Sequence, residues 1–226
     1  MGRALRTDIK DYVYHVINRA NNRADIFKNK NDYKAFEDIL AEGKEKHPMR
    51  ILSYCLMPNH WHMVLYPAQD GDLSRFLHWI TLTHTQRYHA AKRTIGHGHI
   101  YQGRYKSHVV QTNEYYLQLV RYVERNPLRA GLVTHAEDWR WGSLWRRILG
   151  TSEAKTLLAD WPVPLPEGYL TWVNADLKNE DNALDEIRSS VNRGKPYGSE
   201  SWVDNMVKKF GLEITIRRRG RPKKGS

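Results

Sequence analysis

Two histidines separated by one bulky apolar residue stand out in the strand-like stretch of residues 58–64 (PNHWHMV). Side chains two apart on a strand point to the same face, so His60 and His62 can bind one metal ion while Trp61 faces the opposite side. Histidines at strand ends are also frequently structural residues that only make hydrogen bonds. The pair by itself therefore leaves both interpretations open.

A second segment with possible chemistry, residues 114–127 (EYYLQLVRYVERNP), has helical periodicity. Tyr122 and Asn126 lie four apart and share a helix face. A tyrosine hydroxyl can attack a DNA phosphodiester, and an amide oxygen with two imidazoles can hold Mg²⁺ or Mn²⁺. The combination predicts a metal-dependent enzyme that cleaves DNA with tyrosine. In the alternative interpretation, Tyr122 is a rim aromatic and Asn126 only ends the helix before Pro127.

The elements expected around these residues alternate between strands and helices. Strands are predicted at residues 12–17, 50–57, 60–66 and 105–111; helices are predicted to start at Asn31 or Asp32, at Asp72 (ending near Tyr88) and at Thr112 or Asn113. The order β-α-β-β-α-β-α predicts an α+β fold, a ferredoxin-like antiparallel sheet with helices packed on one face.

The character of the chain changes after residue 150. We predict a catalytic domain at 1–150, a proline-rich linker at 151–168, a small helical extension at 169–216 and a basic tail at 217–226. Two helices are expected in the extension, at residues 183–191 and 201–210, and such a pair can form a helix-turn-helix-like module.

Composition favours a nucleic-acid partner. The 226 residues carry 36 Lys and Arg against 25 Asp and Glu, a formal charge of +11, which suits a polyanion, although a merely basic soluble protein would look similar. Eight tryptophans and thirteen tyrosines offer surfaces for base stacking. Cys55 is the only cysteine, and we see neither a signal peptide nor an apolar run of membrane length. These features predict a soluble protein of the reducing cytoplasm.

Several segments together resemble one family. Residues 58–62 resemble the HUH motif of single-tyrosine transposases, and residues 122–131 (YVERNPLRAG) resemble the tyrosine helix of their REP-associated branch. Residues 101–106 and 137–143 are also similar to that branch, so the resemblance covers about residues 10–147.

The resemblance implies specific roles for residues. It implies that Tyr122 is the catalytic nucleophile and that His60, His62 and Asn126 are the metal ligands for Mg²⁺ or Mn²⁺. Asn126 stands where better-known relatives from insertion sequences have glutamine. Tyr115 and Tyr116 are rival nucleophiles, but the family places its tyrosine just before Asn-Pro.

The activity implied by the resemblance is cleavage and rejoining of single-stranded DNA at REP-type palindromic repeats through a 5′-phosphotyrosine intermediate. The expected partner is single-stranded or hairpin DNA, bound by a monomer or homodimer on the nucleoid of a bacterial cytoplasm, with no membrane contact. The alternatives are a noncatalytic sequence-specific DNA-binding regulator and an HUH replication initiator or relaxase.

DNA contacts are expected from basic residues in loops and helix ends near this site, although exposed basic residues are often only solvated charge. The candidates are Arg19, Arg23, Arg104, Lys106, Arg129, Arg219 and Arg221. The last two belong to a segment that resembles an AT-hook, which inserts arginines into the minor groove; nonspecific phosphate binding is the simpler alternative.

Overall fold

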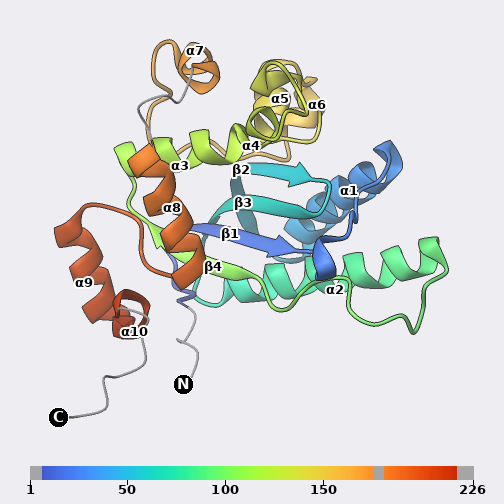
Figure 1. The fold of residues 1–226 in the computed structure, drawn as a ribbon, viewed down its shortest axis with the longest axis horizontal. Helices are drawn as coiled ribbons and strands as arrows, with labels where there is room; N and C mark the ends of the chain where they lie inside the picture. Colours follow the sequence, from blue (N-terminus) through green and yellow to red (C-terminus); the bar gives the residue numbers. More distant parts are fainter. Residues whose placement is uncertain (1–6, 176–180, 218–226) are drawn as a thin grey trace.

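A four-stranded antiparallel sheet forms the centre of the molecule in the computed structural model, which describes residues 7–175 and 181–217 (Figure 1). The strands are β1 (Val13–Arg19), β2 (Met49–Met57), β3 (His60–Pro67) and β4 (Lys106–Val110). Their spatial order is β2-β3-β1-β4, with β1 antiparallel to both neighbours. The α+β class and the antiparallel sheet of the sequence prediction are confirmed.

Helices and short 3-10 turns fill the rest of the described chain. They are α1 (Lys30–Lys46), α2 (Asp72–Lys92), α3 (Glu114–Glu124), α4 (Asn126–Arg129), α5 (Ser143–Ile148), α6 (Ser152–Lys155), α7 (Tyr169–Asn174), α8 (Asp181–Arg193), α9 (Glu200–Phe210), α10 (Glu213–Ile216), η1 (Asn21–Arg23) and η2 (Ala136–Asp138). None of the helices in these described parts of the chain combines the length and apolarity that crossing a lipid bilayer requires.

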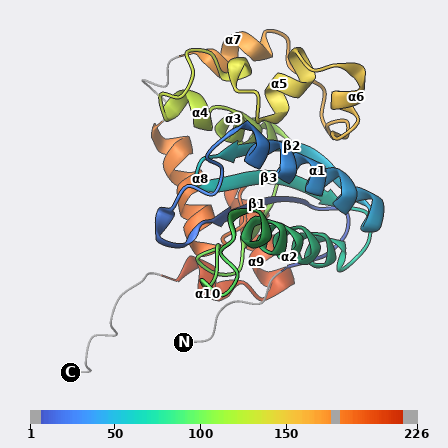
Figure 2. The same ribbon diagram turned by 90° about the vertical axis from the view of Figure 1, so that its right-hand side faces the viewer.

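The helices cover both faces of the sheet, whereas the sequence pattern predicts them on one. Figure 2 shows α1 and α2 side by side, and their apolar residues pack with Trp61 and Met63 of β3 in one core. On the opposite face α3 packs with Val64 of β3 and Val13 of β1 in a second core. Both faces of the strands carry apolar side chains, and each apolar face is stabilised by a helix layer of its own.

The starts of two helices differ from the predicted ones. Helix α1 is capped by Asn29, whose side chain accepts hydrogen bonds from the backbone N–H groups of Asn31 and Asp32, so neither of these residues is the cap. At α2 the capping role of Asp72 is taken by Asp8, whose carboxylate accepts from the N–H groups of Leu73 and Ser74 at 3.1 and 2.8 Å. A capping partner so distant in sequence leaves no local signal.

Two further helix boundaries are the start of α3 and the end of α2. The start of α3 agrees with the prediction, because the Asn113 side chain accepts from the N–H of Tyr115 at 3.1 Å. Helix α2 runs to Lys92, one turn beyond the predicted end near Tyr88, and stops where Arg93 adopts a left-handed conformation with φ of 55°.

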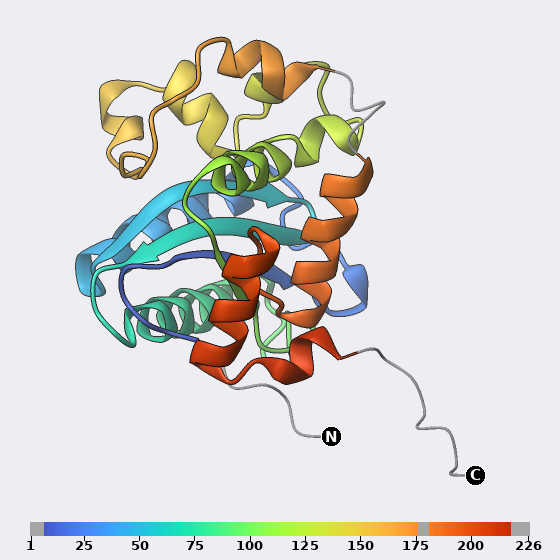
Figure 3. The ribbon, with the colours of Figure 1, turned by 90° about the vertical axis from the view of Figure 1, so that its left-hand side faces the viewer.

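The C-terminal helices pack on the sheet domain (Figure 3). Tyr197 pairs with β4, donating its N–H to the Val109 carbonyl and accepting from Gln111 N–H, both at 2.9 Å. Helix α8 contacts β4 and α3, and Ile187 of α8 lies in the same core as α3. On α9, Phe210 meets Tyr12 edge to face with ring centroids 5.4 Å apart. Residues 181–217 therefore form part of the body that holds the sheet; the predicted domain limits stay a prediction.

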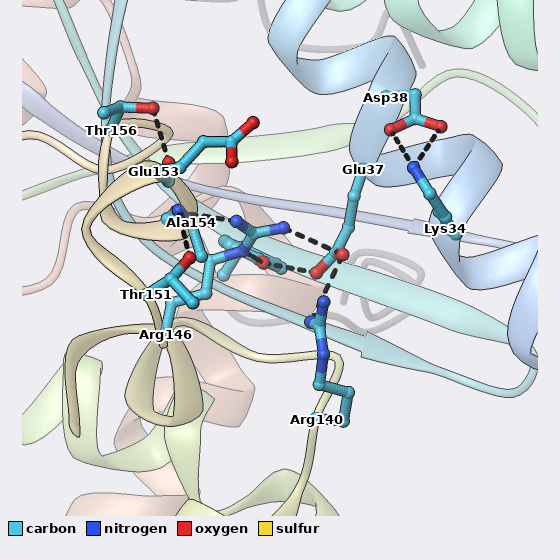
Figure 4. A network of polar contacts seen from close by, with 10 residues as sticks. Lys34, Glu37, Asp38, Arg140, Arg146, Thr151, Glu153, Ala154 and Thr156 are labelled. Atoms are coloured by element: carbon cyan, nitrogen blue, oxygen red, sulfur yellow. Dashed lines mark hydrogen bonds and ion pairs between the residues drawn. The ribbon is translucent and has the colours of Figure 1, made fainter. Parts of the chain in front are cut away.

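A buried polar cluster joins α1, β2 and α5 at the edge of the sheet (Figure 4). Glu37 forms an ion pair with Arg146 at 2.8 Å and a longer one with Arg140 at 3.4 Å. The Tyr54 hydroxyl donates to the same carboxylate at 2.6 Å, and Arg146 donates to the Ala154 carbonyl at 2.6 Å. Every charged group of this Glu37 cluster thus has a partner, as burial requires.

Candidate active site

The two histidines of β3 face α3, on the sheet side opposite Trp61, as the strand alternation predicts. Their ring centroids are 5.1 Å apart, and the ring of Tyr122 meets that of His62 edge to face at 5.7 Å. The β3 pleat and the α3 helix therefore bring Tyr122 to the two histidines, although it lies sixty residues after His62 in sequence.

Hydrogen bonds fix both imidazoles through the same ring nitrogen. Nδ1 of His60 contacts Oδ1 of Asn59 at 2.7 Å, and Nδ1 of His62 contacts Nε2 of His15 at 2.9 Å. Since Nδ1 is occupied in each ring, Nε2 is the nitrogen that remains to bind a metal. The turn before β3 and the neighbouring strand β1 thus orient the two candidate ligands.

Burial keeps both imidazoles in the neutral form that binds metal. Burial lowers the pKa of His60 to about 4, with Arg19 and Arg129 adding to the effect through their charges. Burial also holds the pKa of His62 well below its usual range, with His60 and His15 next in importance. Both nitrogen lone pairs are therefore available at neutral pH.

Asn126 lies beneath Tyr122 and is held from both ends of its amide. Its Nδ2 donates to the carbonyls of Tyr122 at 3.0 Å and Val123 at 3.2 Å, and its Oδ1 accepts from Nη2 of Arg129 at 2.6 Å. In this position Asn126 takes the structural role of the alternative interpretation, because its side chain donates to carbonyls at the end of α3. An amide oxygen has two lone pairs, so one remains for a cation.

The guanidinium of Arg129 lies over the candidate nucleophile. Its central carbon is 4.6 Å from the centroid of the Tyr122 ring, and one of its nitrogens, Nη1, is buried without a hydrogen-bond partner among the described residues. Burial lowers the pKa of Arg129, while Tyr122 acts against that shift. A cation is thus fixed beside the tyrosine on which negative charge would develop.

The donor set fits a divalent ion only in part. Across the described ranges, no group of three or more His, Cys, Asp or Glu side chains is placed to hold a metal. Two neutral imidazoles and one amide oxygen suit Mn²⁺, or Mg²⁺ with additional oxygen ligands, and leave positions for water or substrate oxygens. These donor types are those of an open metal site of the kind used in catalysis rather than of a closed structural one.

The rival tyrosines of α3 pack elsewhere. Tyr116 is fully buried and meets Trp161 edge to face at 5.7 Å, and burial raises the pKa of its hydroxyl. Tyr115 packs on Tyr197 at 5.2 Å. Tyr122 is the α3 tyrosine whose ring contacts the histidines.

The predicted DNA-binding residues lie in three places: beside the histidines, near the start of β4, and in the basic tail. Arg19 pairs with His60 across β1 and β3, and like Arg129 its charge acts on both histidines. Arg23 lies in the turn beside Asn59, whose side chain donates to the Arg23 carbonyl at 3.3 Å. Farther along β1, Lys106 pairs with Ile17 and Arg104 precedes β4. Arg219 and Arg221 lie outside the described residues.

Beside Tyr122, a cavity of about 220 Å³ opens between α3, α4, α7 and α8. Its walls contain Gln118, Arg121, Tyr122, Arg125, Arg129, Trp172, Ala183, Leu184 and Ile187. The guanidinium of Arg121 lies 4.6 Å from the Trp172 ring centroid, and Arg125 donates to the Val173 and Ala175 carbonyls. Arg121 and Arg125 were not among the predicted site residues, although Arg121, Arg125 and Arg129 follow one another at intervals of four, which was the available signal.

Two buried histidines behind the site were also missed. His15 on β1 and His108 on β4 are directly paired in the sheet, and their rings meet edge to face at 5.1 Å. Both are buried on the face that carries His62. The signal for each was a histidine within a predicted strand, which periodicity alone does not distinguish from a core residue.

Comparison with known proteins identifies one family. Residues 8–126 match the family described as Transposase IS200 like. The REP-associated tyrosine transposase of Escherichia coli is 22% identical over 140 residues, 60% of this chain and 77% of that protein. A putative REP-associated tyrosine transposase of Haemophilus influenzae is 20% identical over 134 residues, 56% of this chain and 74% of that protein.

The fold has a solved counterpart. The structure of a REP-associated tyrosine transposase bound to a REP hairpin superposes with a TM-score of 0.55 at 22% identity, covering 74% of this chain and 94% of that one. The match to the family extends over more than half of the sequence and includes His60, His62, Tyr122 and Asn126. This chain belongs to the IS200-like transposase family, whose members are DNA-cleaving enzymes.

Proposed function

We propose that this protein cleaves and rejoins single-stranded DNA with Tyr122 as the nucleophile. The observation that carries the proposal is the contact of the Tyr122 ring with His62, at 5.7 Å between centroids, under the guanidinium of Arg129. A nucleophile, a pair of neutral imidazoles and a fixed cation within one small site are the parts that transfer of a phosphodiester requires.

His60, His62 and Asn126 would hold Mg²⁺ or Mn²⁺. When bound, the ion supplies positive charge to the nonbridging oxygens of the phosphate that is attacked. The support for these ligands is the available Nε2 of each imidazole and the remaining lone pair of the Asn126 oxygen. Arg129 holds that oxygen in place.

The proposed reaction exchanges one phosphodiester for another. The Tyr122 oxygen attacks phosphorus, the bond from phosphorus to the 3′ oxygen breaks, and the tyrosine proton is passed on to that leaving oxygen. The products are a 5′-phosphotyrosine and a free 3′-hydroxyl, and attack by a 3′-hydroxyl on the phosphotyrosine reverses the step. Arg129 stabilises the charge that develops on the tyrosine oxygen.

For the substrate we propose hairpin DNA of REP-type repeats with a short unpaired segment, bound by a monomer or homodimer on the bacterial nucleoid. The support is the name of the curated relatives and the REP hairpin bound in the solved counterpart. Arg19, Arg23, Arg104 and Lys106 would supply cations for the DNA phosphates, and the basic tail would add Arg219 and Arg221.

Covalent capture of DNA tests the proposal. Single-stranded DNA carrying a REP-type hairpin and a 3′ label is incubated with the protein and Mn²⁺, and the denatured protein is examined for a labelled adduct. We expect an adduct with the wild type and with Tyr115→Phe, the matched control on the same helix, and none with Tyr122→Phe. An adduct formed by Tyr122→Phe would refute the nucleophile, and a wild type that binds DNA without forming one would favour the noncatalytic regulator.

A further inference from the structure

A direct hydrogen bond between two buried imidazoles lies behind the candidate metal site. Nε2 of His15 is 2.9 Å from Nδ1 of His62, and the two rings are parallel within 4° with centroids 5.2 Å apart. His15 is 1% exposed and His62 is 2% exposed. Water therefore does not compete for this contact, which raises its electrostatic strength.

The register of the sheet makes this contact a property of the fold. Ile17 of β1 is the residue directly opposite His62, so His15, two positions along the same face, is its diagonal neighbour. His15 is held in turn by its own pairing with His108 on β4. Both backbones are fixed by ladder hydrogen bonds, and the ring of His15 cannot move away without disturbing the core.

We infer that His15 is a positioning residue for the metal site, which accepts the Nδ1–H of His62 and so presents the Nε2 lone pair of His62 to the ion. The inference rests on the proposed function, because it assumes that His62 is a ligand. A neutral imidazole carries one proton, so a ring that donates from Nδ1 has an unprotonated Nε2. Partners of this kind fix the tautomer and the orientation of metal-bound histidines.

The remaining nitrogen of His15 then carries the proton of that ring. This nitrogen, Nδ1, is buried and without a hydrogen-bond partner in the described part of the chain. The His108 ring meets the His15 ring edge to face at 84°, a geometry in which an imidazole N–H can rest on a ring face. Two buried imidazoles in contact, where apolar residues would pack as well, indicate a role beyond filling the core.

Metal binding by His15 variants tests the inference. His15→Phe keeps an aromatic ring but removes the acceptor, and His15→Gln restores an acceptor; binding of Mn²⁺ alone is measured by electron paramagnetic resonance. We expect Mn²⁺ affinity to fall about 10–100-fold in His15→Phe and to recover in His15→Gln, with circular dichroism unchanged. Wild-type affinity in folded His15→Phe would overturn the inference.

A matched control separates positioning from general repacking. His108→Phe alters the neighbouring buried imidazole, which makes no described hydrogen bond to a candidate ligand, and Mn²⁺ affinity should stay near the wild-type value. An equal loss in His108→Phe and His15→Phe would overturn the specific role of His15. Loss of Mn²⁺ binding in His60→Ala is expected whether or not His15 acts; its absence would instead refute the metal site of the proposed function.

The tautomer of His62 gives a test that needs no variant. Nitrogen-15 correlation spectra of the wild-type protein distinguish an imidazole protonated on Nδ1 from one protonated on Nε2. We expect His62 to be protonated on Nδ1 and His15 to be unprotonated on Nε2. The opposite assignment for both rings would overturn the inference even if the His15 variants failed to fold.

Discussion

Two clusters of buried polar side chains lie on the same sheet, one at its β2 edge and one on the face that α3 covers, and they differ in how fully their groups are paired. In the Glu37 cluster, the carboxylate contacts two arginines and a tyrosine hydroxyl, and Arg146 is also bound to a backbone carbonyl. In the site cluster, the described hydrogen bonds of His60 and His62 use only Nδ1. Saturated partners indicate a structural cluster, and available lone pairs indicate a site.

The largest effect is expected on DNA cleavage, when the site cluster loses its histidines. Replacing both His60 and His62 by alanine removes the imidazole donors, and the rate of adduct formation should fall by about 10³-fold or more, the loss of several kcal/mol of charge stabilisation. Chelation of metal from the wild type should give a similar loss that Mn²⁺ reverses. Cleavage by the double variant at the wild-type rate would show that the histidines are structural.

Substitution in the Glu37 cluster should instead lower the stability of the fold. Glu37→Ala leaves Arg146 buried without its carboxylate, and the free energy of unfolding should fall by about 3–5 kcal/mol. Asp38→Ala is the matched control, because Asp38 is the next residue and pairs with Lys34 on the surface, where about 1 kcal/mol or less is expected. Urea denaturation measures both values. Equal losses in the two variants would contradict the structural role of Glu37.

The sequence predicted the local parts of this comparison better than the distant ones. The His60 and His62 face followed from strand alternation, and the cap at Asn113 followed from helix-start preferences. The contact of His15 with His62 depends on the β1–β3 register, and the capping of α2 by Asp8 depends on the path of the N-terminal segment. Neither is encoded within a window of neighbouring residues.

The same limit explains the helices on both faces of the sheet. Alternating apolar residues of β1 and β3 are buried on each side, yet periodicity cannot say which helix covers which side. The Glu37 cluster was not anticipated because Arg146 is more than a hundred residues from Glu37 in sequence. Pairing between distant charged residues becomes visible only in the fold.

A smaller loss of DNA cleavage is expected from replacing Arg129, which contacts both Tyr122 and Asn126. Arg129→Ala removes the cation over Tyr122 and releases the Asn126 oxygen, and adduct formation should slow by about 10²-fold. Arg140→Ala removes another arginine that stacks on aromatic rings, yet belongs to the Glu37 cluster, and should leave the rate per folded molecule unchanged. Equal rates for Arg129→Ala and the wild type would remove Arg129 from the site.

The smallest effect concerns Glu124, a buried carboxylate on α3 that accepts from the hydroxyls of Ser143 and Tyr169 instead of pairing with an arginine. Burial raises its pKa above the ordinary value of 4.5, against the opposing effects of those hydroxyls and of the Arg147 charge. Between 4.5 and the raised pKa the folded protein keeps a proton that the unfolded chain releases. Stability should therefore fall as pH rises through this window, by at most about 1.4 kcal/mol per unit.

Glu124→Gln should remove that slope, because the amide does not titrate. Urea denaturation from pH 5 to pH 8 compares the wild type with the variant, and the contribution of other groups is common to both. Identical slopes would show that Glu124 has the same pKa in the folded and unfolded chain. The expected difference would show how a buried carboxylate behaves with hydroxyl partners, beside the ion-paired Glu37.

Mapping the residue that carries DNA tests the central claim most directly. The wild-type protein is allowed to react with single-stranded hairpin DNA and Mn²⁺, the adduct is digested with protease and nuclease, and the modified peptide is sequenced by mass spectrometry. We predict a nucleotide phosphate on Tyr122 and unmodified Tyr115 and Tyr116. A phosphate on either of the other two tyrosines would contradict the account.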